Sequence, residues 1–117
     1  MSQPPEDARR LAEMLAAAET IVVHVRDMSL AEFEGDGVLR AAVLHWFSVI
    51  GEAASRVSEE GRDRVADIPW REVIGLRHRI VHDYLGVDSV MIFEIMGRDL
   101  PGLIETLRRG AGIDDAG

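Results

Sequence analysis

Apolar residues recur every three or four positions along most of the chain, which is the periodicity of amphipathic helices. The first such segment covers roughly residues 6–26 and has two acidic residues at its start. The second runs from about 38 to 60, where Asp36 is placed to cap the first turn and Gly61 to end the last. The stretch between them, residues 28–37, contains two glycines and is predicted to be a connection.

The same periodicity predicts a third helix in the second half of the chain. A polar connection over residues 62–68 leads to Pro69, which stands in the first-turn position that proline favours. The helix then covers roughly residues 70–84 and stops before Gly86. Most of the candidate functional residues lie on this helix.

A fourth helix is predicted from about Asp88 or Ser89 to about Arg109. Its apolar positions keep one register across Pro101, which favours a single kinked helix over two separate ones. The remaining residues, 110–117, are rich in glycine and aspartate and are expected to form a disordered tail. Four helices with short connections predict an all-α, up-and-down helical bundle, with residues 1–109 as a single domain.

Length and composition limit the class of protein. A chain of 117 residues suits one domain, and the absence of cysteine excludes disulfides, thiolate catalysis and cysteine-based zinc sites. No apolar run approaches the roughly 18 residues that cross a bilayer, and the N-terminus lacks a signal pattern, so we expect a cytoplasmic protein without a membrane partner. All 13 basic residues are arginine, which indicates the codon usage of a GC-rich bacterial genome.

The charge balance also argues against one kind of partner. The 21 acidic residues outnumber the 13 basic ones and give a formal net charge of −8. A protein that coats nucleic acid without sequence preference needs a large excess of positive charge. The balance leaves room for a small basic site.

One arginine interrupts the apolar pattern of the third helix. On a wheel of about 100° per residue, Arg77 lies at the centre of the apolar stripe. Its stem could cover the edge of the core while the guanidinium reaches water, or the guanidinium could face a groove or an oligomer interface and bind an anion. The apolar residues within roughly 60° of Arg77 are Trp70, Val73, Ile74, Ile80, Val81 and Tyr84.

The histidines raise a metal hypothesis. His78 and His82 lie one helical turn apart, a spacing at which two imidazoles can share a metal. The sequence has no HExxH glutamate and no cysteine, and a third ligand would have to come from His45, Glu52 or Asp83. A metal-binding bundle therefore stands as one alternative function.

Two further positions on the predicted helices bear on the site. Gly51 indicates close helix packing, which would place the neighbouring Glu52 near another helix. His24 and His45 are isolated on their helices and are expected to be structural or exposed rather than catalytic.

The third helix ends in an arginine, four residues, a histidine, one residue and a tyrosine. This segment, Arg77 to Tyr84, resembles the RX4HXY motif of HepT-like proteins, a branch of the HEPN superfamily of helical ribonucleases. The resemblance extends over about residues 8–109. It includes short segments at family-like spacing on both sides of the motif: Ile50-Gly51-Glu52-Ala53, Ile68-Pro69-Trp70-Arg71, Ile74-Gly75-Leu76, Gly86-Val87-Asp88 and Asp99-Leu100-Pro101.

The resemblance implies a homodimeric, HEPN-like bundle that acts as a metal-independent endoribonuclease without a cofactor. It implies the toxin of a type VII-like toxin–antitoxin pair, with RNA as its substrate. Arg77 and His82 would be the catalytic pair, and Tyr84 the residue that a cognate minimal nucleotidyltransferase (MNT type) adenylylates to silence the enzyme. His78 stands where the family often has asparagine. Supporting roles are assigned to His78, Arg79, Asp83 and Glu52.

The residue types suit this chemistry. Histidine changes charge near neutral pH, so His82 can serve as general base or acid. Arg77 can hold phosphoryl oxygens through two hydrogen bonds as charge develops on them. Because one histidine per chain is a sparse catalytic set, a two-fold dimer that brings two motifs together would complete it. Arg71 and Arg79 would make the site locally basic.

A different class of function remains open beside the enzyme. The chain could be a catalytically silent helical dimer that only binds a nucleotidyltransferase. The presence of Arg77, His82 and Tyr84 together favours the ribonuclease.

Overall fold

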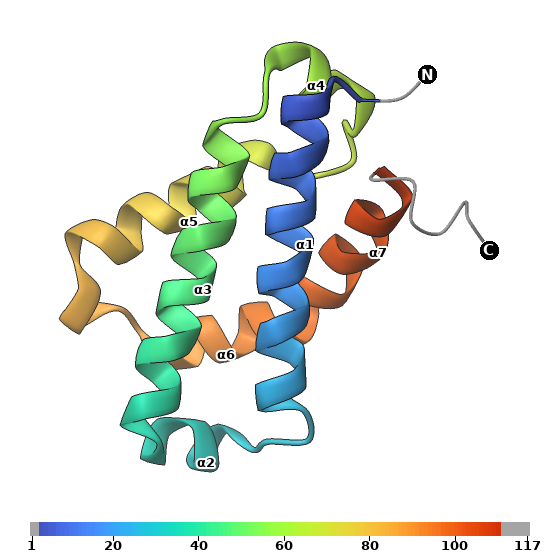
Figure 1. Cartoon of the computed structure of the whole chain (residues 1–117). Helices are drawn as coiled ribbons and strands as arrows, with labels where there is room; N and C mark the ends of the chain where they lie inside the picture. Colours follow the sequence, from blue (N-terminus) through green and yellow to red (C-terminus); the bar gives the residue numbers. More distant parts are fainter. Residues whose placement is uncertain (1–2, 111–117) are drawn as a thin grey trace.

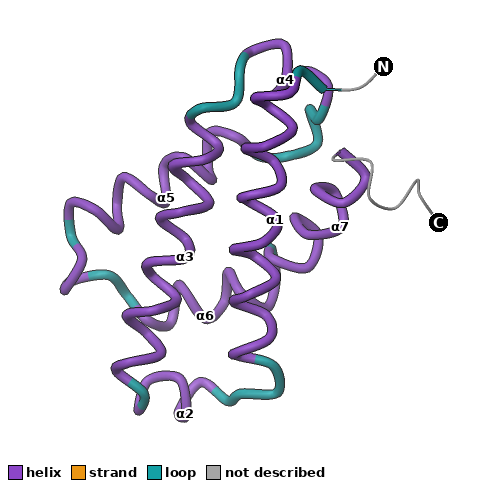
Figure 2. The backbone as a smooth tube through the Cα atoms, viewed as in Figure 1, coloured by secondary structure: helices purple, strands orange, loops and turns teal. Residues whose placement is uncertain are grey.

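The computed structural model describes residues 3–110, and this part of the chain consists of helices and the turns between them (Figure 2). The all-α class predicted from the sequence is confirmed. Within the described residues, seven α-helices and one 3-10 turn follow one another: α1 (Pro5–Val25), α2 (Leu30–Gly35), α3 (Gly37–Ser55), α4 (Glu59–Arg64), α5 (Trp70–His82), η1 (Tyr84–Gly86), α6 (Ser89–Arg98) and α7 (Leu100–Gly110).

The helices form two layers. The long helices α1 and α3 stand side by side and run in opposite directions, while α5 crosses behind α3 and α7 lies beside α1 (Figure 1). The molecule measures 45 × 32 × 19 Å, so its shortest dimension is about two helix diameters. Since α5 packs chiefly on α3 and projects beyond it, one flank of α5 lies at the edge of the molecule.

The apolar stripes predicted from the sequence meet between these layers. The stripe of α1 faces α3 and α7, and the stripe of α3 faces α1 and α5. No helix within residues 3–110 has the length and apolar character to span a membrane. The largest fully buried side chains are those of Phe33, Leu11, Met14, Ile21, Ile50, Ile80, Ile92, Leu100, Leu107 and Val43.

The predicted connection over residues 28–37 is wrong, because it contains helix α2. Ser29 and Glu32 form a reciprocal capping box: the Ser29 hydroxyl accepts the Glu32 N–H at 3.1 Å, and the Glu32 carboxylate accepts the Ser29 N–H at 2.9 Å. Hydrogen bonding from the Ser29 N–H, and secondly from the Ser29 side chain, lowers the pKa of the exposed Glu32 carboxyl. Phe33 is then buried, which anchors the short helix to the core.

Two predicted helix starts are confirmed. The carboxylate of Asp36 accepts the N–H of Leu39 at 2.9 Å and caps α3. The carboxylate of Asp88 accepts the N–H of Val90 at 2.9 Å and caps α6.

The predicted second helix, residues 38–60, breaks earlier than expected. Helix α3 ends at Ser55 and α4 begins at Glu59, so Gly61 lies inside a helix and does not end one. The predicted polar connection over residues 62–68 is accordingly shortened by the last turn of α4. The break occurs because Ser58 caps α4, its hydroxyl accepting the Gly61 N–H at 3.1 Å.

A buried carboxylate near the start of α1 fixes this break. Asp7 is 3% exposed and accepts the Ser58 N–H at 2.9 Å and the Ser58 hydroxyl at 2.5 Å. Gly61 leaves the space for it, since a Cβ at that position would lie 2.5 Å from an Asp7 carboxylate oxygen. The start of α1 is thereby tied to the start of α4.

The third predicted helix is shorter than the expected 70–84. Helix α5 ends at His82, and Pro69 is the residue before its first turn rather than inside it. The Gly86 N–H bonds to the Asp83 carbonyl at 2.9 Å, and the Asp83 carboxylate lies 2.6 Å from where a Gly86 Cβ would be. Tyr84 therefore lies on a 3-10 turn beyond the α-helix.

The prediction of one kinked helix across Pro101 is also wrong. Helix α6 ends at Arg98 and α7 begins at Leu100, with Asp99 between them. Proline has no N–H to bond to the carbonyl four residues earlier, that of Gly97, so the hydrogen-bond ladder is interrupted here. The two helices keep the predicted apolar register because both bury their stripes in the same core.

The last helix reaches further than predicted. Gly110, expected to begin the tail, is the final residue of α7. A Cβ there would lie 2.9 Å from both methyl carbons of Val65, so the glycine lets the end of α7 touch the loop after α4. The rest of the predicted tail, residues 111–117, lies outside the described residues.

Candidate active site

The position of Arg77 is set by a close approach of two helices. A Cβ built on Gly51 of α3 would lie 2.3 Å from the Cβ of Arg77 on α5. Only glycine permits this contact, so the backbone of α3 comes close to α5 beside Arg77. The inference that Gly51 marks close packing, and that Glu52 would face another helix, is confirmed.

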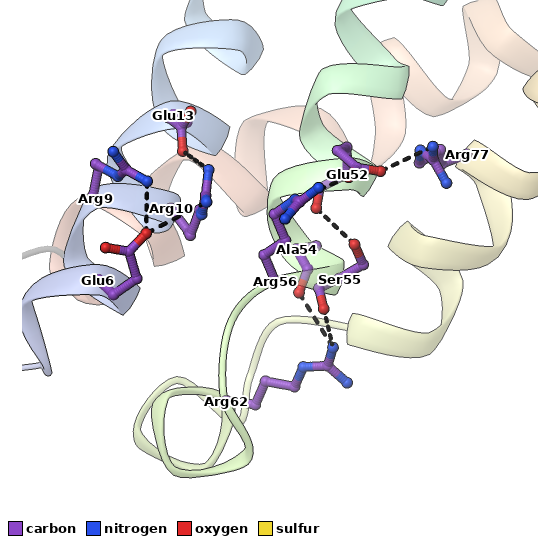
Figure 3. Close-up of polar contacts among 10 residues, drawn as sticks. All are labelled: Glu6, Arg9, Arg10, Glu13, Glu52, Ala54, Ser55, Arg56, Arg62 and Arg77. Carbon is purple, nitrogen blue, oxygen red and sulfur yellow. Dashed lines mark hydrogen bonds and ion pairs between the residues drawn. The ribbon is translucent and has the colours of Figure 1, made fainter.

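Arg77 is half-buried and paired with Glu52. One terminal nitrogen of its guanidinium lies 2.9 Å from a Glu52 oxygen, and the side chain is 28% exposed. The other Glu52 oxygen accepts a hydrogen bond from Arg56 at 2.9 Å (Figure 3). One carboxylate thus bridges two guanidinium groups. An ion pair this accessible contributes about 0–1 kcal/mol, so an anionic ligand can compete with it.

The Arg77 guanidinium opens into a hollow of about 290 Å³ formed by three helices. Helix α1 contributes a charged pair, in which Arg10 lies 3.0 Å from Glu13 (Figure 3). Helix α3 contributes the polar side chains of His45, Ser48 and Glu52. The lining residues are Arg10, Glu13, His45, Ser48, Val49, Glu52, Ala53, Arg77 and Val81.

A larger hollow lies elsewhere and does not contain Arg77. It measures about 540 Å³ and lies between α5 and the α6–α7 pair, over the apolar side chains of Phe47 and Ile50. No histidine lines it. We place the candidate site at the smaller hollow because its lining combines Arg77 with a histidine, whereas the charged residues that line the larger hollow are Asp67, Glu72, Arg98 and Asp99.

His82 does not share the Arg77 hollow within one chain. It is exposed on α5, where its ring lies parallel to that of His78 with centroids 6.5 Å apart. Five residues at about 100° each place His82 about 140° around the helix from Arg77. The described residues contain no group of three or more potential metal ligands.

Tyr84 lines a third hollow. Its ring is 44% exposed, and its hydroxyl donates a long hydrogen bond of 3.4 Å to the carbonyl of Ala41. The hollow measures about 210 Å³ and lies between the start of α3 and the start of α6. A bond of this length is weak, so the phenol oxygen remains chemically accessible.

Two of the predicted supporting residues hold the end of α5 in place. The guanidinium of Arg79 donates to the sulfur of Met91 on α6 at 3.3 Å. Asp83 ends the helix, its N–H bonding to the Arg79 carbonyl at 3.0 Å. Both residues are exposed, and neither lines the Arg77 hollow.

Sequence reasoning did not place three of the lining residues beside Arg77, although it considered His45 as a possible metal ligand and as an isolated, structural or exposed histidine. Arg10, His45 and Ser48 come from two other helices. The available signal was spacing, because His45, Ser48 and Glu52 lie at i, i+3 and i+7 and therefore share one face of α3. The spacing alone does not show what lies beside that face; the packing of α5 against it brings Arg77 next to these residues.

Comparison with known proteins adds independent information. The model of the family described as "Ribonuclease HepT-like" matches residues 11–109. A protein of Methanocaldococcus jannaschii, the RNase candidate MJ1380, is 30% identical over 91 residues, which are 78% of this chain and 84% of that protein.

Two further relatives cover similar shares of the chain. The RNase candidate TTE0752 of Caldanaerobacter subterraneus subsp. tengcongensis is 31% identical over 80% of this chain and 83% of its own length. The probable ribonuclease HepT of Thermococcus cleftensis is 29% identical over 85% of this chain and 93% of its own length. No solved structure matches the chain with comparable significance.

Proposed function

This chain belongs to the HepT-like ribonuclease family, and from that membership we propose that it is a metal-independent RNA endonuclease in which Arg77 and His82 act on the scissile phosphate. The observation that carries the proposal is the Arg77 guanidinium, held by Gly51 and Glu52 at an open polar hollow. A guanidinium held only by an accessible ion pair is suited to binding a phosphate.

The reaction proceeds by internal attack within the RNA. A histidine removes the proton of a 2′-hydroxyl, and the 2′-oxygen forms a bond to the adjacent phosphorus. The bond from phosphorus to the 5′-oxygen breaks, and that oxygen takes up a proton. The products are a 2′,3′-cyclic phosphate and a 5′-hydroxyl end. Arg77 stabilises the charge that develops on the phosphoryl oxygens.

Two copies of the chain build each site. Arg77 and His82 lie about 140° apart on α5, so one helix does not aim both groups at one phosphate. We propose a homodimer whose α5 helices line a cleft on the two-fold axis, with Arg77 of one subunit facing His82 of the partner subunit. Val81 and Tyr84, which are 55% and 44% exposed, provide apolar surface on this flank.

Glu52 acts as a positioning residue in this scheme. Its two oxygens hold Arg56 and Arg77, each at 2.9 Å, and so fix the direction of the Arg77 guanidinium. Arg79 and Asp83 position the segment that follows α5, through their contacts with Met91 and with the turn. His78 supports His82 by ring stacking.

The biological setting we propose is a type VII-like toxin–antitoxin pair. A cognate nucleotidyltransferase of the MNT type transfers AMP to the Tyr84 hydroxyl: a bond forms from that oxygen to the α-phosphorus of ATP, and pyrophosphate leaves. Tyr84 suits this role because its ring is exposed and its hydroxyl makes one weak bond. The added phosphodiester charge and nucleoside would block the RNA cleft.

The decisive experiment is cleavage of end-labelled RNA in the presence of EDTA. Wild-type protein should cleave, and His82→Ala should lose about 10²- to 10⁴-fold, because a proton-transfer group is removed from an exposed position. The matched control is His24→Ala, which removes another exposed histidine, on α1, and should retain full activity.

Two outcomes would contradict the ribonuclease proposal. Full activity of His82→Ala would remove His82 from the mechanism. Absence of cleavage by the wild type across varied RNA substrates would favour the silent binding partner instead.

A further inference from the structure

His45 is an unused polar group in the Arg77 hollow. It lies on α3, seven residues before Glu52, which places it about 10 Å away along the helix axis. The imidazole is exposed, and it has no hydrogen-bond or ring partner among the residues that the structure describes. Ser48 also lines the hollow, between His45 and Glu52 along α3.

The other charged groups of the hollow are already engaged. Arg10 of α1 is held by Glu6 and Glu13, at 3.4 and 3.0 Å. Arg77 of α5 is held on one edge by Glu52 of α3, at 2.9 Å. Figure 3 draws the contacts of Arg10 with Glu6 and Glu13 on α1 and, separately, the contact of Arg77 with Glu52.

The charge of the hollow therefore depends on His45. Arg10 and Arg77 contribute two positive charges, and Glu13 and Glu52 contribute two negative charges. Glu6, which pairs with Arg10, and Arg56, which pairs with Glu52, add one charge of each sign, so the six charges cancel. Histidine is the side chain that ordinarily gains its charge between pH 8 and 5. When His45 is protonated, the hollow carries a net positive charge beside Arg77, and when it is neutral, the hollow carries none.

From this arrangement we propose that the hollow is an RNA-backbone subsite in which protonated His45 binds a phosphate neighbouring the one held by Arg77. Ser48 supplies a second hydrogen-bond donor to the same phosphate. The inference rests on the proposed ribonuclease function, since it identifies how the substrate extends from the scissile bond. It makes His45 a substrate-binding residue, and RNA affinity becomes dependent on pH through it.

The test measures binding without cleavage. A labelled single-stranded RNA with 2′-O-methyl groups cannot be cleaved by internal attack, so its Kd with the full chain can be measured by fluorescence anisotropy. At pH 6, His45→Ala should weaken binding by about tenfold or more, the usual size of a charge-assisted hydrogen bond. At pH 8 the same variant should bind within twofold of the wild type.

Two further variants separate a charge effect from a structural one. His45→Arg keeps a positive charge at both pH values, so it should bind tightly at pH 8, where the wild type does not. His24→Ala, which removes a histidine whose ring makes a tilted contact with Trp46 outside the hollow, should behave as wild type. His78 and His82 are present in all of these proteins, so their contribution to binding cancels in each comparison.

Salt dependence gives a second readout that a structural role would not move. Each phosphate contact to a single strand contributes about 0.7 to the slope of log K against log salt. At pH 6, His45→Ala should reduce the magnitude of this negative slope by about 0.7 relative to the wild type. At pH 8 the two proteins should have the same slope.

The outcomes distinguish the inference from the function on which it rests. If the wild type cleaves ordinary RNA but His45→Ala keeps wild-type affinity and slope at pH 6, the subsite is overturned and the ribonuclease stands. If ordinary RNA is not cleaved while binding depends on His45 as described, the nucleic-acid subsite stands and the ribonuclease is overturned.

Discussion

Replacing Gly51 by alanine tests the close approach that places Arg77. The new Cβ would lie 2.3 Å from the Arg77 Cβ and 3.2 Å from its Cγ and Cδ. Carbon atoms in ordinary contact are about 3.5–4.0 Å apart. Because the nearest atom is itself a Cβ, no rotation of the Arg77 side chain removes the clash. Helices α3 and α5 must therefore move apart by about 1 Å or more.

A second glycine provides the control for the magnitude. Overpacking of this kind costs about 1–3 kcal/mol, while alanine is favoured over glycine inside a helix by about 1 kcal/mol. Gly75 lies inside α5, and a Cβ there would have no atom within 4 Å. Gly75→Ala therefore gains the helix preference without the clash. The difference between the two variants isolates the packing cost of Gly51→Ala, about 1–3 kcal/mol.

Thermal unfolding and RNA cleavage measure the two consequences. For a domain of this size, 1 kcal/mol shifts Tm by about 4 °C, so Gly51→Ala should melt about 4–12 °C below Gly75→Ala. Displacing Arg77 by about 1 Å should also lower cleavage by up to about 10²-fold, whereas Gly75→Ala should remain active. If Gly51→Ala melts at or above Gly75→Ala, the close approach of α3 and α5 is not the constraint described here.

Two other predictions concern Asp7 and Tyr84. Asp7→Ala removes the buried acceptor of two Ser58 hydrogen bonds, so it should lower the free energy of unfolding, measured by urea titration, by about 2–3 kcal/mol. The control Glu59→Ala replaces an exposed side chain and should change the free energy of unfolding by less than about 0.5 kcal/mol. A loss for Asp7→Ala no larger than that of the control would show that this pair does not stabilise the fold. Co-expressed with its nucleotidyltransferase, the wild type should gain adenylyl mass and lose activity, while Tyr84→Phe should gain none and stay active, because the phenol oxygen is lost and the ring packing is kept. Equal modification of both proteins would remove Tyr84 as the switch.

The long helices could be predicted from the sequence because their apolar stripes span several turns. The short helix α2 was missed because six residues are too few to show a period, although the capping box of Ser29 and Glu32 is a local signal. The break before α4 depends on Asp7, which lies 51 residues from Ser58 along the chain. No local pattern carries that information.

The candidate site could be predicted from the sequence only where a local pattern carried the information. Gly51 indicated close packing, and this correctly placed Glu52 beside another helix. The neighbourhood of His45 could not be predicted, since it depends on where α5 crosses α3 and α1 runs alongside. A local repeat identifies residues on one helix face, but only the packing angle between helices decides which of them share a hollow.

The divergence of Arg77 and His82 on α5 leads to a test of how the site is divided between subunits. If each cleft combines Arg77 of one subunit with His82 of the partner subunit, then Arg77→Ala and His82→Ala proteins are each inactive, yet a mixed dimer regains one intact cleft.

Equal amounts of the two variants, exchanged by mild unfolding and refolding, form mixed dimers in about half of the population. One of the two clefts in each mixed dimer is complete, so the mixture should recover about a quarter of the wild-type activity. Each variant refolded alone should recover none, which controls for refolding itself. A double variant, Arg77→Ala with His82→Ala, mixed with wild type should leave no complete cleft in the mixed dimers. If mixing the single variants restores nothing while mass measurement shows that mixed dimers have formed, the two residues act within one subunit, and α5 must then change conformation to bring them to the same phosphate.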